Sequence, residues 1–152
     1  MKKSNSIRSR ILKLDEVKQE ALRLRLKSKT IALITGDFDV LNESNVTVLA
    51  KAASFADVLF VGIVSDASLK KDQGENHSHN DENARAFVVA SLVMVDNVVV
   101  FDEGALSELI KLIRPDVLVK SNDQSAELAM ETKEVLAAGG KVETVSPEEE
   151  SL

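Results

Sequence analysis

Apolar residues follow two patterns along this chain: short continuous runs, and positions that recur every three or four residues. The continuous runs have the length and β-branched content of strands that are buried on both faces. They predict strands at residues 30–34, 58–64, 97–101, 117–120 and 141–145. The periodic segments predict helices at residues 46–53, 82–92, 105–113 and 126–138. Because parallel neighbouring strands need crossover helices, this alternation predicts an α/β fold with a doubly wound sheet of about five parallel strands.

The N-terminal region predicts one amphipathic helix ahead of the first strand. Residues 1–6 read as a frayed polar tail, and apolar positions from Ile7 to Leu24 then recur at spacings of three and four. This apolar stripe fits packing on the domain and packing on a second copy of the chain equally well. We divide the chain into an N-terminal tail and helix at residues 1–27, an α/β domain at residues 28–146 and an acidic tail at residues 147–152.

Turn-forming residues and one polar stretch mark the connections between these elements. Residues 65–81 are polar, contain Gly74 and both histidines, and predict a long loop across the carboxyl edge of the sheet. Pro115 should end the helix that precedes the fourth strand. The pair Gly139 and Gly140 should end the last helix in a left-handed cap.

Charge is distributed unevenly. Residues 1–29 hold ten basic and three acidic residues, a net +7, whereas the rest of the chain carries −13. An acidic body argues against extended nucleic-acid binding, which needs clustered Lys and Arg. The chain has no cysteine, no signal-peptide core and no apolar run near the roughly 18 residues of a membrane span. We therefore expect a cytoplasmic protein that does not act at a membrane.

The segment that follows the first predicted strand carries a recognisable motif. Residues 36–45 resemble the Gly-x-Phe-Asp-x-x-His-x-Gly-His element of the cytidylyltransferase-like nucleotidyltransferases. Asn42 and Asn45 stand where that family has its two histidines, and Glu43 and Ser44 lie between them. The resemblance implies a Rossmann-like nucleotidyltransferase fold whose catalytic motif is degenerate.

The resemblance extends along the chain and is closest to the adenylyltransferases that act on heptose 1-phosphate in lipopolysaccharide core synthesis. The blocks that carry it are residues 64–68, 82–86, 95–99, 114–120 and 139–142. The family mechanism that this implies is attack of a sugar phosphate oxygen on the α-phosphate of ATP, with pyrophosphate leaving and Mg²⁺ assisting. Such chemistry depends on positioning and on stabilising the charge that develops on the transferred group.

The chain departs from the family pattern at further positions. The resemblance implies that the residues at these positions contact phosphate in the family. Gln73 replaces a lysine, His77 replaces an arginine, and Ser121-Asn122 replaces a Gly-Gly pair. The family's C-terminal Ser/Thr-rich phosphate motif would begin near residue 150, where the sequence stops. The resemblance leaves no intact catalytic residue, and its nucleotide-binding candidates are Gly36, Phe38, Asp39, Asn42, Asn45, Lys70, Lys71, Arg85, Lys120 and Asp123.

Several candidates also fit purely structural roles. Lys70 and Lys71 fit a solvated pair in a polar loop, and Arg85 fits an ion pair with Asp81 or Glu82. Asp39 and Asp123 fit turn stabilisers as well as substrate contacts. His77 and His79 could share a face of an extended segment, but no third ligand has suitable spacing, so we assign no metal site.

Three functional hypotheses remain. The first is a non-catalytic member of the fold that acts as a binding, regulatory or scaffolding module, as a homodimer with a nucleotide or sugar-phosphate ligand and no required cofactor. The alternative is an active adenylyl- or cytidylyltransferase in which Lys70, Lys71, Arg85 and Lys120 supply the charge and Mg²⁺ accompanies ATP or CTP. The third is a structural partner that docks through its basic N-terminal helix.

Overall fold

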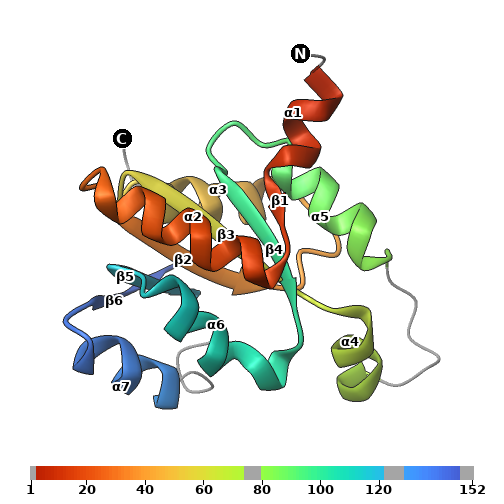
Figure 1. The fold of residues 1–152 in the computed structure, drawn as a ribbon. Coiled ribbons are helices and arrows are strands. Elements are labelled where there is room, and N and C mark those ends of the chain that lie inside the picture. Colours follow the sequence, from red (N-terminus) through yellow and green to blue (C-terminus); the bar gives the residue numbers. More distant parts are fainter. Residues whose placement is uncertain (1–2, 74–79, 122–128, 148–152) are drawn as a thin grey trace.

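The computed structural model describes residues 3–73, 80–121 and 129–147, and its centre is one parallel β-sheet (Figure 1). The strand order is β1-β4-β3-β2-β5-β6. The strands are β1 (Ile11–Leu12), β2 (Ile31–Gly36), β3 (Val58–Val64), β4 (Asn97–Phe101), β5 (Val117–Ser121) and β6 (Lys141–Val145). The five predicted strands and their parallel pairing are confirmed, and β1 adds a short sixth at one edge.

Helices cover both faces of this sheet. They are α1 (Lys3–Ser9), α2 (Leu14–Leu26), α3 (Glu43–Ala53), α4 (Asp66–Gln73), α5 (Glu82–Ala90), α6 (Leu106–Ile113) with the 3₁₀ turn η1 (Glu103–Ala105) ahead of it, and α7 (Ala129–Ala137). Figure 1 shows α2, α6 and α7 on one face, and α3 and α5 on the other. This is the doubly wound α/β arrangement expected from the sequence.

Alternation along the strands explains why both faces need helices. In β2, Ile31 and Leu33 enter the apolar cluster that contains residues of α2 and α6, whereas Ala32 and Ile34 enter the cluster that contains residues of α3 and α5. All four residues are at most 1% exposed. A strand buried on both faces reads as a continuous apolar run, which is why the sequence revealed it.

The prediction of a single N-terminal helix is wrong. Residues from Lys3 onward form α1, and the chain then straightens at Ile11 and Leu12 to pair with Val98 and Val99 of β4. Ile11 packs against one apolar cluster and Leu12 against the other, so consecutive side chains point to opposite faces, as in a strand. The unpaired edge of β4 overrides the helical spacing of the local sequence.

The prediction of a loop from residue 65 is also wrong as far as Gln73. Residues 66–73 form α4, whose first turn is fixed by Ser65: its Oγ accepts from the Ser68 backbone N–H at 3.2 Å, and its carbonyl accepts from the Leu69 N–H at 3.0 Å. Leu69 is the buried apolar anchor of this helix, at 5% exposure. A helix with so few apolar residues carries almost no periodic signal. Residues 74–79 of the predicted loop lie outside the described residues.

Two predicted helix ends are confirmed. α6 stops at Ile113, Arg114 turns left-handed with φ of 50°, and Pro115 follows. α7 stops at Ala137, and Gly139 has φ of 90°. The Gly140 N–H donates to the Val135 carbonyl at 2.9 Å, which is the hydrogen bond of a Schellman cap.

Candidate functional site

The sheet has its topological switch point between β2 and β5. From β2 the chain builds outward through β3 and β4, and the later strands β5 and β6 add on the opposite side. Ile34 pairs with Val119, so the carboxyl ends of β2 and β5 lie side by side. Ligands of open α/β sheets bind outside the strand ends at such a point. The predicted candidates Gly36 and Lys120 both lie at these ends.

The turn after β2 is held in a strained conformation. Phe38 has φ of 49°, a left-handed value that a bulky residue rarely adopts. Its side chain is buried at 8% exposure and folds back on Gly36, where an added Cβ would lie 3.0 Å from a ring carbon. Gly36 therefore leaves room for the Phe38 ring.

Asn42 and Asn45 form the N-terminal cap of α3. The Oδ1 atom of Asn42 accepts from the Asn45 backbone N–H at 3.1 Å, and the Oδ1 atom of Asn45 accepts from the Asn42 N–H at 3.3 Å. This is a capping box, with asparagine at both ends. Each side chain keeps its NH₂ group, a neutral hydrogen-bond donor. Glu43 and Ser44 are exposed in the first turn of the helix.

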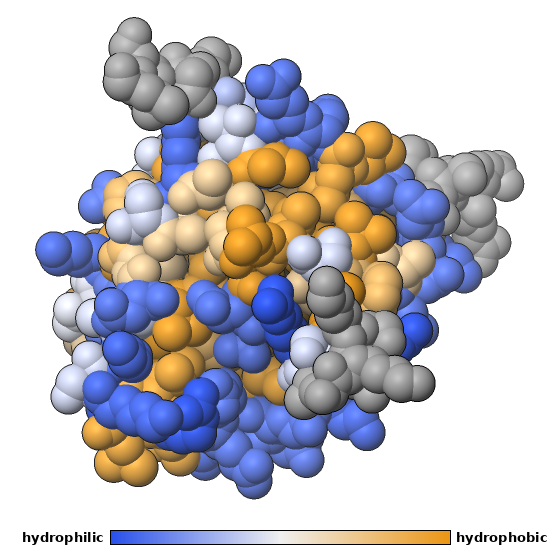
Figure 2. Space-filling view, turned by 90° about the horizontal axis from the view of Figure 1, so that it is seen from above, coloured by the Kyte–Doolittle hydropathy of each residue, from blue (hydrophilic) through white to orange (hydrophobic). Residues whose placement is uncertain are grey.

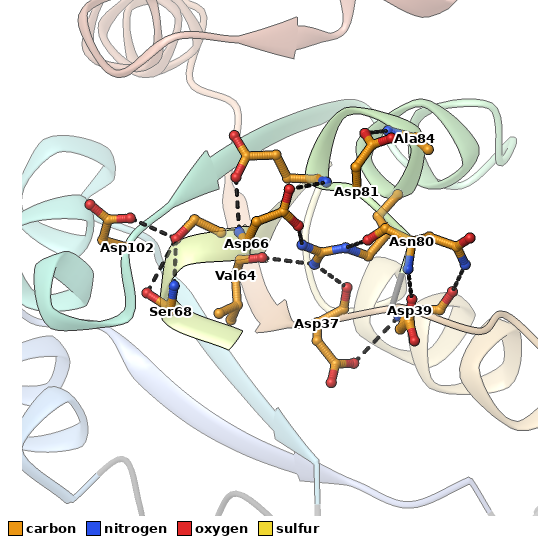
Figure 3. A network of polar contacts seen from close by, with 12 residues as sticks. Asp37, Asp39, Val64, Asp66, Ser68, Asn80, Asp81, Ala84 and Asp102 are labelled. Atoms are coloured by element: carbon orange, nitrogen blue, oxygen red, sulfur yellow. Dashed lines mark hydrogen bonds and ion pairs between the residues drawn. The ribbon is translucent and has the colours of Figure 1, made fainter. Parts of the chain in front are cut away.

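Asp39 is tied to the residue two positions before α5. Its Oδ1 atom accepts from the Asn80 backbone N–H at 2.7 Å, and its carbonyl accepts from the Asn80 side-chain amide at 2.9 Å (Figure 3). The sequence left two roles open for Asp39, a turn stabiliser and a substrate contact. In the structure Asp39 stabilises the turn through these two hydrogen bonds.

Arg85 is the most buried charged residue of the site, at 2% exposure. Its guanidinium pairs with the Asp66 carboxylate at 2.8 Å, so the ion-pair role is confirmed, but the partner is Asp66 and the suggested partners Asp81 and Glu82 are wrong. Asp81 instead caps α5 by accepting from the Ala84 N–H at 2.9 Å. The Arg85 side chain is 0% exposed, so in this conformation it does not reach a ligand.

The remaining lysines lie in different surroundings. Lys120 is 7% exposed near the end of β5, and its Nζ donates to Thr132 Oγ1 of α7 at 3.1 Å. Lys70 and Lys71 are exposed in the last turn of α4. Asp123 lies outside the described residues.

The candidates thus separate into groups. Asp39 and Arg85 belong to one polar network around the end of β2, joined through Asn80 and the Asp37 carbonyl (Figure 3). Phe38 lies between Asp37 and Asp39 in the chain, and Asn42 and Asn45 follow at the start of α3. Asp39, Arg85 and Lys120 are fixed in place by residues that were not predicted as site residues, namely Asn80, Asp66 and Thr132. Asp66 lies in a block that carries the family resemblance, but its partner is 19 residues away and no local spacing points to it.

Among residues 3–73, 80–121 and 129–147, no three His, Cys, Asp or Glu residues gather where they could hold a metal ion. Within the same ranges, none of the helices has the length and apolar character to cross a bilayer.

Known proteins resemble this chain in sequence and in fold. Residues 33–147 match the sequence model of a family described as cytidylyltransferase-like. The bifunctional protein HldE of Aliarcobacter butzleri is 40% identical over 148 residues, which cover 93% of this chain and 31% of that protein. The protein of the same name from Proteus mirabilis is 36% identical over 151 residues, which cover 95% of this chain and 32% of that protein. The chain thus spans about a third of the length of these relatives.

Solved structures show the same fold. A lipopolysaccharide core biosynthesis protein from Thermoplasma volcanium superposes with a TM-score of 0.66 at 22% identity, covering 81% of this chain and 99% of that chain. A pantoate-beta-alanine ligase from Francisella tularensis superposes with a TM-score of 0.68 at 13% identity, covering 92% of this chain and 67% of that chain. At these identities the likeness concerns the fold alone.

Proposed function

The chain belongs to the cytidylyltransferase-like family, and on that basis we propose that it is a catalytically degenerate member that acts as a nucleotide-binding, regulatory or scaffolding module. The resemblance drawn from the sequence is confirmed at the level of the family and the fold. The observation that carries the proposal is the Asn42–Asn45 capping box. It occupies the two positions that resemble the family's histidines.

Asparagine cannot replace a charged imidazole in this chemistry. Nucleotidyl transfer needs groups that stabilise the charge developing on the α-phosphate, and an amide never carries positive charge. Losing one such group typically slows catalysis by a factor on the order of 100 or more. Both Oδ1 atoms already accept backbone hydrogen bonds of α3, so the side chains are held by the helix. Glu43 adds a carboxylate to the same helix turn.

Weak nucleotide binding is compatible with the same arrangement. The N-terminal end of α3 follows the turn after β2, and helix N-termini attract phosphate through backbone amides and the helix dipole. Lys120 supplies a buried cation on the neighbouring strand β5. These features favour a nucleotide or sugar-phosphate ligand.

Mg²⁺ would enter this site together with a nucleotide. Mg²⁺ binds most often through substrate phosphates and one or two carboxylates, so it needs no cluster of protein ligands. Asp37, exposed directly after β2, is the carboxylate placed to assist. The ion would supply positive charge next to the phosphates, and the chain would supply the helix end and Lys120.

The proposal is tested by measuring binding and chemistry separately. Titration of ATP and CTP with Mg²⁺ should show binding by the wild type, and an assay with a sugar 1-phosphate should detect no pyrophosphate release. A variant with Asn42→His, Asn45→His, Glu43→Ala and Ser44→Gly should bind more tightly. Pyrophosphate release by the wild type at a rate abolished by Lys120→Ala would overturn the proposal.

The second candidate function is an active transferase that moves a nucleotide from ATP or CTP to a sugar phosphate of the heptose 1-phosphate type. It is favoured by identities of 36–43% to proteins named as bifunctional HldE. In that case Lys120 and Mg²⁺ would have to provide the charge that the two asparagines lack. The same pyrophosphate assay separates the two functions.

We also propose that the protein acts as a cytoplasmic homodimer. Figure 2 shows apolar residues gathered across one face with polar residues around them. A gathered apolar surface of this kind suits self-association. Large apolar side chains are exposed among the described residues, with Val93 at 91% and Leu26 at 88%. Light scattering at several concentrations would test this, and a strictly monomeric mass would contradict it.

A further inference from the structure

One guanidinium joins three connections at the carboxyl edge of the sheet. Arg85 Nη1 donates to the carbonyls of Asp37 at 2.9 Å and Val64 at 2.7 Å, and its Nε donates to the Asn80 carbonyl at 2.8 Å. Its Nη2 donates to Asp66 Oδ1 at 2.8 Å. The acceptors belong to the turn after β2, the end of β3, the start of α4 and the residues before α5 (Figure 3). The buried Arg85 guanidinium thus connects these four segments through four donated hydrogen bonds.

The conformation of the turn after β2 depends more on the hydrogen bonds of Arg85 and its neighbours than on the turn's own residues. The φ of 49° at Phe38 needs support from neighbouring residues, because a left-handed conformation is strained for a bulky residue. Its support comes from both sides: Arg85 bonds the Asp37 carbonyl, and Asn80 bonds Asp39 twice. Both supporting residues are contributed by α5 and the residues just before it.

The start of α5 is itself fixed in place. Asp66 and Glu82 exchange hydrogen bonds: the Asp66 N–H donates to Glu82 Oε1 at 2.9 Å, and the Glu82 N–H donates to Asp66 Oδ2 at 3.1 Å. Asp66 therefore holds the Arg85 guanidinium with one carboxylate oxygen and the first residue of α5 with the other. The residues that support the turn are thus themselves hydrogen-bonded to the start of α4.

We propose that Arg85 is a positioning residue that holds residues 37–39 in the shape that a nucleotide meets at the end of β2. This inference rests on the proposed nucleotide site and deepens it. Arg85 itself contacts no ligand and acts through the Asp37 carbonyl, and Asn80 acts beside it through Asp39. An ordered turn binds its ligand without an ordering penalty, so loss of Arg85 should weaken nucleotide binding.

A matched control is available at the other end of the same helix. Arg10 Nη1 donates to the carbonyls of Ala90, Leu92 and Val95, at distances of 3.1 to 3.5 Å. Arg10→Gln therefore removes an arginine that bonds several carbonyls around α5 without touching the turn after β2. A general loss of stability should appear in both variants, whereas a positioning effect should appear only in Arg85→Gln.

The experiment combines amide hydrogen exchange with nucleotide titration. The reporter is the Asn80 amide, which donates to Asp39 Oδ1, and the α5 amides serve as the internal reference. We expect Arg85→Gln to speed exchange at Asn80 and Asp39 by about tenfold or more. It should also weaken ATP binding by about tenfold, because the turn must then be ordered on binding. Arg10→Gln should leave the exchange rates at Asn80 and Asp39 and the ATP affinity unchanged, once any change in the global stability of the variant has been subtracted.

The outcomes separate this inference from the proposed function. Unchanged exchange in Arg85→Gln, or equal loosening in Arg10→Gln, would overturn the positioning role. If the wild type binds no nucleotide, the proposed function fails, and exchange at Asn80 still decides whether Arg85 holds the turn. If Arg85→Gln does not fold, Arg85→Lys replaces it: one amine cannot reach four acceptors, so the turn should still exchange faster than in the wild type.

Discussion

Asn42 and Asn45 cap the N-terminus of α3 together, each side-chain oxygen accepting from the backbone N–H of the other residue, at 3.1 and 3.3 Å. The pair occupies the two positions that correspond to histidines in the family motif that residues 36–45 resemble. Asparagine is among the best residues for an N-cap, because its side-chain oxygen satisfies a backbone donor that the helix leaves unpaired. At these positions the chain has residues suited to helix stability, while the positive charge of the family motif is absent.

Asn42→Ala should lower the free energy of unfolding by about 1 kcal/mol, because it removes the N-cap acceptor of α3. Asn42→Asp keeps the acceptor and should stay close to the wild type. Urea denaturation followed by circular dichroism measures both. Equal stability of the alanine and aspartate variants would contradict the capping role.

Lys120→Met should weaken ATP binding by about tenfold, because it removes a cation beside the proposed phosphate position and keeps the aliphatic volume. Thr132→Val is the matched control: it removes the hydroxyl that accepts from Lys120 Nζ and leaves the charge in place. Calorimetric titration measures both affinities, and thermal unfolding checks that both variants fold. Equal affinity of Lys120→Met and the wild type would show that this lysine is not part of the nucleotide site.

Gly140→Ala should destabilise the protein by about 1–3 kcal/mol through overpacking. An added Cβ would lie 2.7 Å from Val135 Cγ1 and 2.9 Å from the Pro115 carbonyl oxygen. Gly104→Ala is the control, since nothing lies within 4 Å of its added Cβ. The difference between the two alanine variants in denaturant midpoint gives the steric effect, and coincident midpoints would contradict it.

Asp57 should contribute stability that is lost in acid. Hydrogen bonds from the Thr30 backbone N–H and hydroxyl hold the pKa of the Asp57 carboxyl below its ordinary value. A carboxyl whose pKa is depressed in the folded state stabilises the fold above its unfolded pKa, and this contribution disappears as pH falls through the folded pKa.

Asp57→Asn should therefore be less stable than the wild type near neutral pH, and the difference should shrink as pH falls from about 5 to about 2. Thr30→Val removes the hydroxyl, which donates to the Asp57 carboxylate and also accepts from the Asp57 backbone N–H. It leaves the Thr30 backbone N–H in place and should show part of the pH-dependent effect. Denaturant titrations at several pH values supply the measurement. A difference independent of pH would mean that the carboxyl does not titrate differently in the folded and unfolded chain.

Much of the fold was readable because its determinants are local. Val58 to Val64 is an unbroken apolar run, and the strand β3 has those same bounds. Gly139 was recognised as a left-handed cap because few other residues adopt a φ of 90°. The family motif at residues 36–45 also consists of contiguous residues, so the resemblance could be seen without a structure.

The errors share one physical cause. Ile11 and Leu12 have helical spacing, but their backbone groups pair with β4, which lies more than 80 residues away in the sequence. Residues 66–73 lack apolar periodicity, but α4 forms around Ser65 and the buried Leu69. In both cases a distant or polar partner decided the conformation, and a periodicity of apolar residues does not record such partners.

The sequence by itself determined the doubly wound architecture and the family, because these depend on residue identity and short-range order. Only the tertiary structure decided what the polar residues of the site do. Arg85 was expected to pair within its own helix turn or to meet a ligand, yet it pairs with Asp66 and bonds the Asp37 carbonyl. These partners come from different strands and helices, and they meet only because the sheet brings the carboxyl ends of its strands to one edge.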